Sequence, residues 1–209
     1  MAGEVSKEEV GSVLMQAMMA AKNLRPQRDR LLHLRRRLQR LQAGPAAPDE
    51  DKLGDLAADL FKVYYIGMEA GARMLSVCLE LARLPARPTT QPEALARVGA
   101  ALFAVKLPEE YHIPRCIEHL VGSRPPHPGG KHDTSSPDGK PRQTTAIDLG
   151  KALDFLDRGC TILSLAVKHV DLAVAVLSRF LDRKELAGLA EFTDKVAYIS
   201  EDGPYPSTD

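Results

Sequence analysis

Apolar residues recur at alternating spacings of three and four along two long stretches of the chain, residues 53–84 and 146–181. This spacing keeps an apolar stripe on one side of a helix, with the period of supercoiled helix packing. Long helices that bury such stripes pack into bundles. The pattern therefore predicts an all-α fold, a helical bundle of five or six helices built on two long helices. We expect these two helices to be antiparallel neighbours, since antiparallel packing is frequent in single-chain bundles.

The N-terminal part of the single helical domain expected over residues 1–209 has two apolar-periodic segments. They cover residues 7–24 and 31–41, and Pro26 lies between them. Proline disrupts a helix interior and disfavours helical backbone in the residue before it. We therefore expect two helices that form a hairpin over residues 1–44.

Residues 52–107 are expected to form the first long helix and a shorter one, because a capping pattern and a new apolar face follow the first stripe. Residues 145–200 are expected to form the second long helix and a C-terminal helix. Pro108 and Pro114 bracket a connection that we expect to be irregular.

Two segments lack the composition of a packed element. Residues 122–144 are rich in proline, glycine, serine and threonine and contain no large apolar residue. Such a segment cannot bury enough apolar surface to fold, so we expect a flexible loop. Residues 203–209 include a glycine and two prolines, and we expect a disordered tail there.

Charge and cysteine content narrow the class of protein. The 28 Lys and Arg residues balance the 28 Asp and Glu residues, so no net charge steers the whole chain toward nucleic acid or anionic lipid. Three cysteines form no paired framework, and the N-terminal residues lack the apolar core of a secretory signal. We therefore expect an intracellular protein, cytoplasmic or nuclear. The apolar stretch 162–181 carries charged residues that are costly in a bilayer, and we interpret it as a buried helix.

The densest charge feature is a set of seven arginines between residues 25 and 40. Guanidinium groups match phosphate geometry, so this basic face is a candidate site for nucleic acid or anionic phospholipid. The alternative is a solvated helix face that pairs with the acidic start of the next helix, from Asp49 to Asp59. The arginines named as candidates are Arg28, Arg35, Arg36, Arg37 and Arg40.

Small residues interrupt the first apolar stripe at Gly67, Ala70 and Gly71. Glycine inside a helix lowers helix stability by about 1 kcal/mol relative to alanine, so we expect these glycines to have a structural or functional role. The missing side chains permit close approach of another helix. A small ligand against this flat patch, or a kink at Gly67, is the alternative that makes these three residues candidate binding residues.

His112, Cys116 and His119 have the four-then-three spacing that places three side chains on one helix face, as zinc ligands require. Pro114 interrupts the helix that this arrangement needs, and no standard metal motif supports it. We therefore expect no metal and no cofactor. No serine or cysteine is marked by a nearby base and orienting group, so we also expect a protein that is not an enzyme.

Both long helices carry a second apolar line beside the first, which includes Tyr64 and Cys78 on one and Ala152 and Ala166 on the other. This is more apolar surface than one contact between two helices buries. We therefore expect a non-enzymatic interaction protein, an adaptor or a subunit of a larger complex, that binds partner proteins through helices. A homo-oligomer formed through the same helices is an open alternative. The alternative function is binding of nucleic acid or anionic phospholipid through the arginine-rich helix.

Overall fold

The computed structural model describes residues 7–44, 49–83, 91–122 and 147–196. Within these ranges it contains six α-helices and no strand, which confirms the all-α bundle. The expected loop over 122–144 lies outside the described residues apart from Gly122, and so does the expected tail over 203–209. The α-helices are α1 (Lys7–Ala43), α2 (Glu50–Arg83), α3 (Gln91–Leu107), α4 (Ile113–Val121), α5 (Leu149–Leu177) and α6 (Arg183–Val196).

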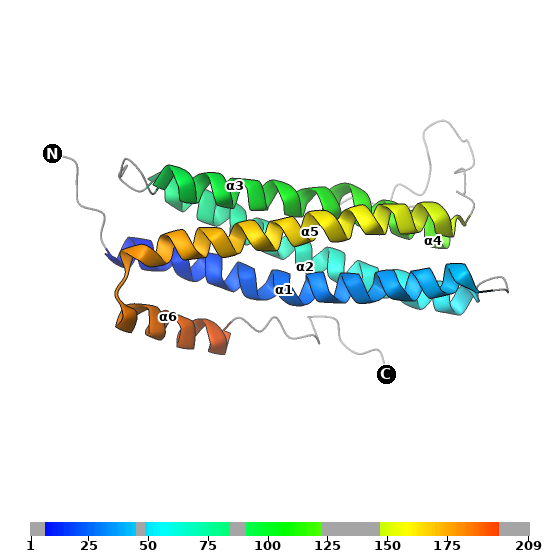
Figure 1. The fold of residues 1–209 in the computed structure, drawn as a ribbon, viewed down its shortest axis with the longest axis horizontal. Coiled ribbons are helices and arrows are strands. Elements are labelled where there is room, and N and C mark those ends of the chain that lie inside the picture. The colour runs from blue at the N-terminus through cyan, green and yellow to red at the C-terminus, as the bar shows by residue number, and fades with distance from the viewer. Residues whose placement is uncertain (1–6, 45–48, 84–90, 123–146, 197–209) are drawn as a thin grey trace, which may run out of the picture.

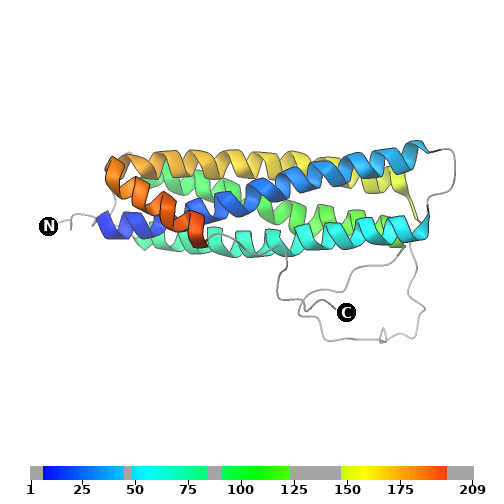
Figure 2. The ribbon, with the colours of Figure 1, turned by 90° about the horizontal axis from the view of Figure 1, so that it is seen from below.

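Four helical rods run alternately in opposite directions along the bundle: α1, α2, α3 continued by α4, and α5 (Figure 1). The α1 helix packs against α2 and α5, and α3 packs against the same two helices. The remaining two pairs, α1 with α3 and α2 with α5, therefore lie on the diagonals, as Figures 1 and 2 show from two sides. Each apolar stripe points toward the axis shared by all four rods.

The two long helices of the sequence pattern, α2 and α5, are thus neither neighbours nor antiparallel, and that prediction was wrong. They run in the same direction across a diagonal (Figure 1). The reason is the rod between them. The chain reverses once between α2 and α3 and again between α4 and α5, and two reversals restore the original direction.

The N-terminal hairpin expected over residues 1–44 was also wrong, because α1 is one continuous helix with Pro26 inside it. Leu24 and Leu31, on either side of the proline, are fully buried. Pro26 itself is exposed, so its ring faces solvent rather than the core. The apolar burial of both halves against α2 and α5 outweighs the helix-breaking cost of the proline, about 3 kcal/mol.

The connection between Pro108 and Pro114 is helical rather than irregular. A π-helical turn, Pro108–His112, joins α3 to α4. Pro114 lies in the first turn of α4, where a missing N–H leaves no helix bond unmade. The proline that was expected to break the helix therefore stands where helices tolerate it.

The α6 helix lies outside the four-rod bundle, against α1 (Figure 2). Asp182 precedes it and accepts hydrogen bonds from the N–H groups of Lys184 and Glu185. A short 3₁₀ turn, Ser178–Phe180, links it to α5. Among the described helices, the continuous segment Leu149–Phe180 is long and apolar enough to cross a membrane by length and composition, a property that core helices of bundles share.

Candidate functional site

Most arginines on the basic face of α1 form ion pairs with acidic residues of the same chain. Arg37 Nη1 lies 2.7 Å from Asp59 on α2, as the solvated-face alternative predicts. Arg35 pairs with Asp157, and Arg25 lies 2.7 Å from Asp171. These two acids belong to α5, so the arginines are neutralised on two sides of α1. The hydrogen bond and charge of Asp157 also raise the pKa of Arg35 above its ordinary value.

The other candidate arginines divide into two cases. Arg28 bonds the adjacent Asp29, with Nη2 2.8 Å from the carboxylate, and lines an open groove of about 330 Å³ between α1 and α5. That groove also contains Lys168 and Asp171, so its charge is mixed. Arg36 and Arg40 are exposed and form no ion pair with any described residue. Phosphate binding stays a prediction that rests mainly on these two side chains.

The small-residue patch of α2 has a different geometry from a tight helix crossing. A Cβ placed on Gly67 would have no atom within 4 Å, so no backbone approaches there. The α2 helix is continuous through this point. Ala70 and Gly71 are buried in the core. Gly67 therefore borders empty space, whereas Ala70 and Gly71 are packed in the core.

The space beside Gly67 is a small, partly open cavity of about 10 Å³, which is room for one water molecule and too little for an organic ligand. Gln27 of α1 lines it, and the Oε1 atom of this buried side chain has no hydrogen-bond partner within the protein. Val105 and Pro108 reach it from α3 and the π turn. The cavity is lined by Leu24, Gln27, Val63, Tyr64, Gly67, Val105, Pro108, Ile113 and Leu163.

The histidines of the π turn and α4 pack around Phe155 of α5. The ring of His119 stacks on Phe155 with centroids 5.6 Å apart, and Tyr111 meets the same ring edge-on at 5.8 Å. His112 is buried next to them, and burial together with the charge of Arg158 lowers its pKa below the ordinary value. These contacts are those of an aromatic packing cluster.

Cys116 lies in the core, and burial raises the pKa of its thiol well above the usual range. Burial likewise raises the pKa of Cys160 to about 12. Metal ligation and nucleophilic attack both need the thiolate, which these surroundings disfavour. Within the described residues, no three His, Cys, Asp or Glu side chains are grouped as a metal site requires.

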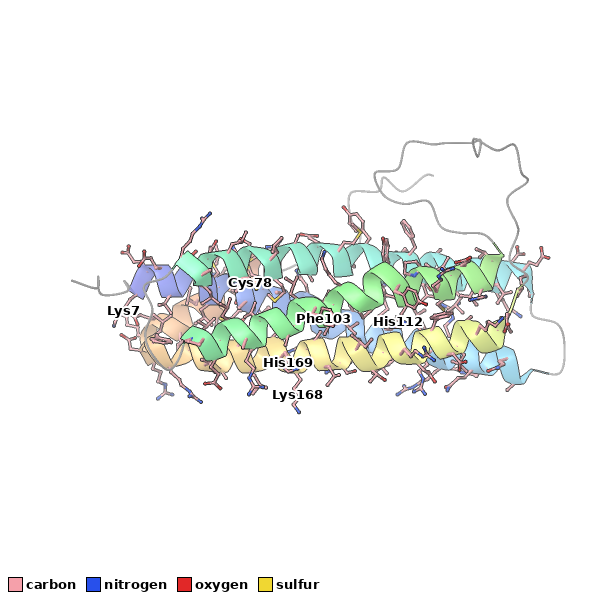
Figure 3. All side chains as sticks on the ribbon, turned by 90° about the horizontal axis from the view of Figure 1, so that it is seen from above. Lys7, Cys78, Phe103, His112, Lys168 and His169 are labelled. Carbon is pink, nitrogen blue, oxygen red and sulfur yellow. The ribbon has the colours of Figure 1, made fainter. Side chains whose placement is uncertain are left out.

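A surface that the sequence pattern did not single out lies on the outer side of α3. Phe103 is 68% exposed, more than any other large apolar side chain among the described residues. Figure 3 looks onto this side, with Phe103 in view on α3. On the same side lie the exposed Ala96 and the part-buried Gly99 and Ala100. We call Ala96, Gly99, Ala100 and Phe103 the α3 face.

The α2 helix extends this apolar surface. Leu75 and Leu79 are 50% and 54% exposed. Tyr64 lines one cavity with Val105 of α3 and therefore marks the side of α2 that turns toward α3. Leu75 lies about 20° and Leu79 about 60° round the helix from Tyr64, so both leucines lie on the α3 side of α2.

A signal for the α3 face was present in the sequence. Between Glu93 and Lys106 the helix contains a single charged residue, Arg97. A helix that is apolar on every side is covered on every side in a folded protein or an assembly. Its inner side packs in the core, and its outer side is exposed in the isolated chain.

Comparison with known proteins gives the chain no relatives: no family model, no curated protein and no solved structure matches it.

Proposed function

We propose that this chain is a non-enzymatic interaction protein, an adaptor or complex subunit, that binds an apolar helix on the α3 face. The observation that carries the proposal is Phe103, an aromatic side chain that is 68% exposed on an almost uncharged helix. Covering a side chain of this kind is worth about 1.5–3 kcal/mol. Aromatic residues, phenylalanine among them, are enriched at protein interfaces relative to the rest of the protein surface.

The shape of the surface suits a helix as the bound element. The small residues Gly99 and Ala100 form a shallow depression in the middle of the α3 face. A Cβ on Gly99 would have no atom within 4 Å. Glycine there costs about 1 kcal/mol of helix propensity, and no contact inside the described structure explains it. A partner helix that approaches closely at this point supplies a reason. Leu75 and Leu79 of α2 offer such a helix a second line of contact.

The opposite side of the bundle differs in character. There α1 forms ion pairs with α2 and α5, and α6 packs against it (Figure 2). Charged, paired surfaces contribute little binding energy, because the median worth of an exposed ion pair is below 1 kcal/mol. The contrast between the two sides supports an interface on α3 rather than on α1.

The test is a pull-down that compares wild-type bait with Phe103→Asp bait, analysed by mass spectrometry at low and high salt. We expect proteins that are retained by the wild type at both salt concentrations and lost with the variant, because apolar contacts are not screened by salt. Phe192→Asp is the matched control. It changes another exposed phenylalanine, 48% accessible, on α6.

Retention of the same proteins by both phenylalanine variants would contradict an interface on α3. Binding that is lost at high salt and depends on Arg36 and Arg40 would instead favour the phosphate-binding alternative.

A further inference from the structure

The α3 face has a self-complementary arrangement about the midpoint between Gly99 and Ala100. Counting outward from that point, Ala96 and Phe103 are equally distant, and so are Glu93 and Lys106. Each pair joins unlike partners: a small side chain with a large one, and an acid with a base. A surface of this kind matches a second copy of itself turned end for end.

We propose that the partner bound on the α3 face is a second copy of this chain, paired through antiparallel α3 helices in a two-fold symmetric dimer. This inference rests on the proposed function, because it uses the same face and names its occupant. A two-fold contact closes on itself, so it gives a dimer rather than a chain of subunits.

In this arrangement the exposed ring of Phe103 packs on Ala96 of the other copy. The two α3 helices come closest at Gly99 and Ala100, where small side chains allow helix axes to approach to about 8 Å. Antiparallel pairing forms each of these contacts twice. Parallel pairing would instead put Phe103 against Phe103 and leave the two small patches facing each other across a gap.

The charged residues at the ends of the α3 face also favour antiparallel pairing of two copies. Glu93 and Lys106 are exposed at the two ends of the α3 face. Antiparallel pairing places each Glu93 beside Lys106 of the other copy, whereas parallel pairing opposes like charges. Arg97, the remaining charged residue of this stretch, is part-buried about 100° round the helix from Ala96, away from the contact.

The adjoining helices fit the same symmetry. Val105 and Pro108 line one cavity with Val63 and Gly67. Since α2 and α3 are antiparallel, this level matching puts Gly99 beside the turn of α2 that contains Leu75. A two-fold axis through the middle of the α3 face then brings Leu75 of one copy toward Leu75 of the other, which enlarges the apolar contact.

The first experiment is sedimentation equilibrium of the full chain over a wide range of concentrations. We expect a monomer–dimer equilibrium for the wild type and for Phe192→Asp, and a monomer for Phe103→Asp. Phe103 makes little contact in the isolated chain, so Phe103→Asp keeps its fold, as circular dichroism will check. A wild type that is monomeric at every concentration, or a dimer that survives Phe103→Asp, would overturn the proposal.

Charge exchange tests the antiparallel register. Glu93→Lys opposes two bases at each end of the contact and Lys106→Glu opposes two acids, so each variant alone should dimerise at least tenfold more weakly than the wild type. A mixture of the two variants restores both attractions and should form mixed dimers close to wild-type strength. Failure of the mixture to gain over the separate variants would contradict this register.

Cysteine substitutions give a second check. Ala100→Cys lies within about 1 Å of the two-fold axis along the helix and should form a disulfide-linked dimer under mild oxidation. Ala96→Cys is the matched control, since the two copies of residue 96 are about 10 Å apart along the helix in the antiparallel pair. Cross-linking of Ala96→Cys to itself would show a parallel pair and overturn the proposal.

The outcomes also separate this inference from the proposed function. A monomeric wild type that still loses other proteins from the pull-down on Phe103→Asp would refute the dimer and support a different partner on the same face. A monomer that dimerises only when residues 197–209 are deleted would show that the chain's own C-terminal segment occupies the face, which also refutes the proposal.

Discussion

Gly67 illustrates what a sequence conveys about one residue. A glycine on the apolar stripe of a long helix suggests that something lies close to it, and the sequence could not say what. In the structure nothing lies within 4 Å of the position a Cβ would take, and Gly67 borders a cavity of about 10 Å³. The empty volume depends on side chains from α1, α3 and α5, which no local pattern specifies.

We expect Gly67→Ala to stabilise the fold by about 1 kcal/mol, because alanine is the better helix former and its methyl group enters unoccupied space. The free energy of unfolding in urea measures this. Gly54→Ala is the control, since Gly54 is exposed and equally unobstructed and reports helix propensity without cavity filling. A loss of stability in Gly67→Ala would mean that the backbone there needs the glycine.

His112 predicts a pH dependence. Burial lowers its pKa below the ordinary value of 6.5, so the folded state favours the neutral ring. As the pH falls below 6.5, the unfolded chain takes up the proton first and stability is lost until the folded-state pKa is passed. The slope contributed by one such group is at most about 1.4 kcal/mol per pH unit.

The measurement is the free energy of unfolding between pH 7.5 and pH 5.5 for wild type and His112→Phe. We expect a shallower decline for the variant, which keeps a ring beside Tyr111 and Phe155 but cannot be protonated. Equal slopes in the two proteins would show that His112 is not the responsible group.

At the scale of elements, Pro26 separates local propensity from tertiary packing. The proline has no N–H and its ring crowds the carbonyl group of Lys22 one turn earlier, so a local interpretation ends the helix there. The observed α1 continues because Leu24, Leu31 and the residues beyond them are buried against two other rods. Removing α1 from the bundle on one side of Pro26 would expose that surface.

We therefore expect Pro26→Ala to raise the free energy of unfolding by about 1–3 kcal/mol, since alanine restores one helix hydrogen bond and relieves the clash. Urea unfolding measures the difference. Pro92→Ala provides the comparison, because Pro92 lies in the first turn of α3, where proline is tolerated, and should change stability little. A destabilised Pro26→Ala would indicate that the packing of α1 requires a bend at the proline.

At the scale of the whole molecule, stability is uneven. The four rods share one core, whereas α6 packs mainly on α1 and adds no buried apolar side chain to that core among its described residues. Of the described α6 side chains, Thr193 is buried and the others are exposed or part-buried. Helices with few buried contacts open at a lower free energy than the core.

Hydrogen exchange followed by mass spectrometry should show this order directly. We expect the amides of α6 to exchange well before those in the middle of α2 and α5. If α6 exchanges as slowly as α5, it is part of the cooperative core, and its contact with α1 is stronger than its burial indicates.

The α3 face also belongs to the whole-molecule scale. Its residues could be read from the chain, yet an apolar helix looks the same in a sequence whether all its sides are covered or one is exposed. For the arginines of α1, the sequence identified the basic residues but only some of their acidic partners. Asp59 was an expected partner, whereas Asp157 and Asp171 are more than a hundred residues away and reach α1 only through the fold.

The sequence by itself determined most of the helical segments of the bundle, because a helix and its apolar stripe follow from spacings within a few residues. It located α2 and α5 to within a few residues of their ends and indicated that they had to be buried. Tertiary structure alone decided which helices are neighbours, in which direction they run, and that α1 passes through Pro26. These depend on burial shared between distant segments, and two chain reversals, not the matching of two stripes, set α2 and α5 parallel across the diagonal.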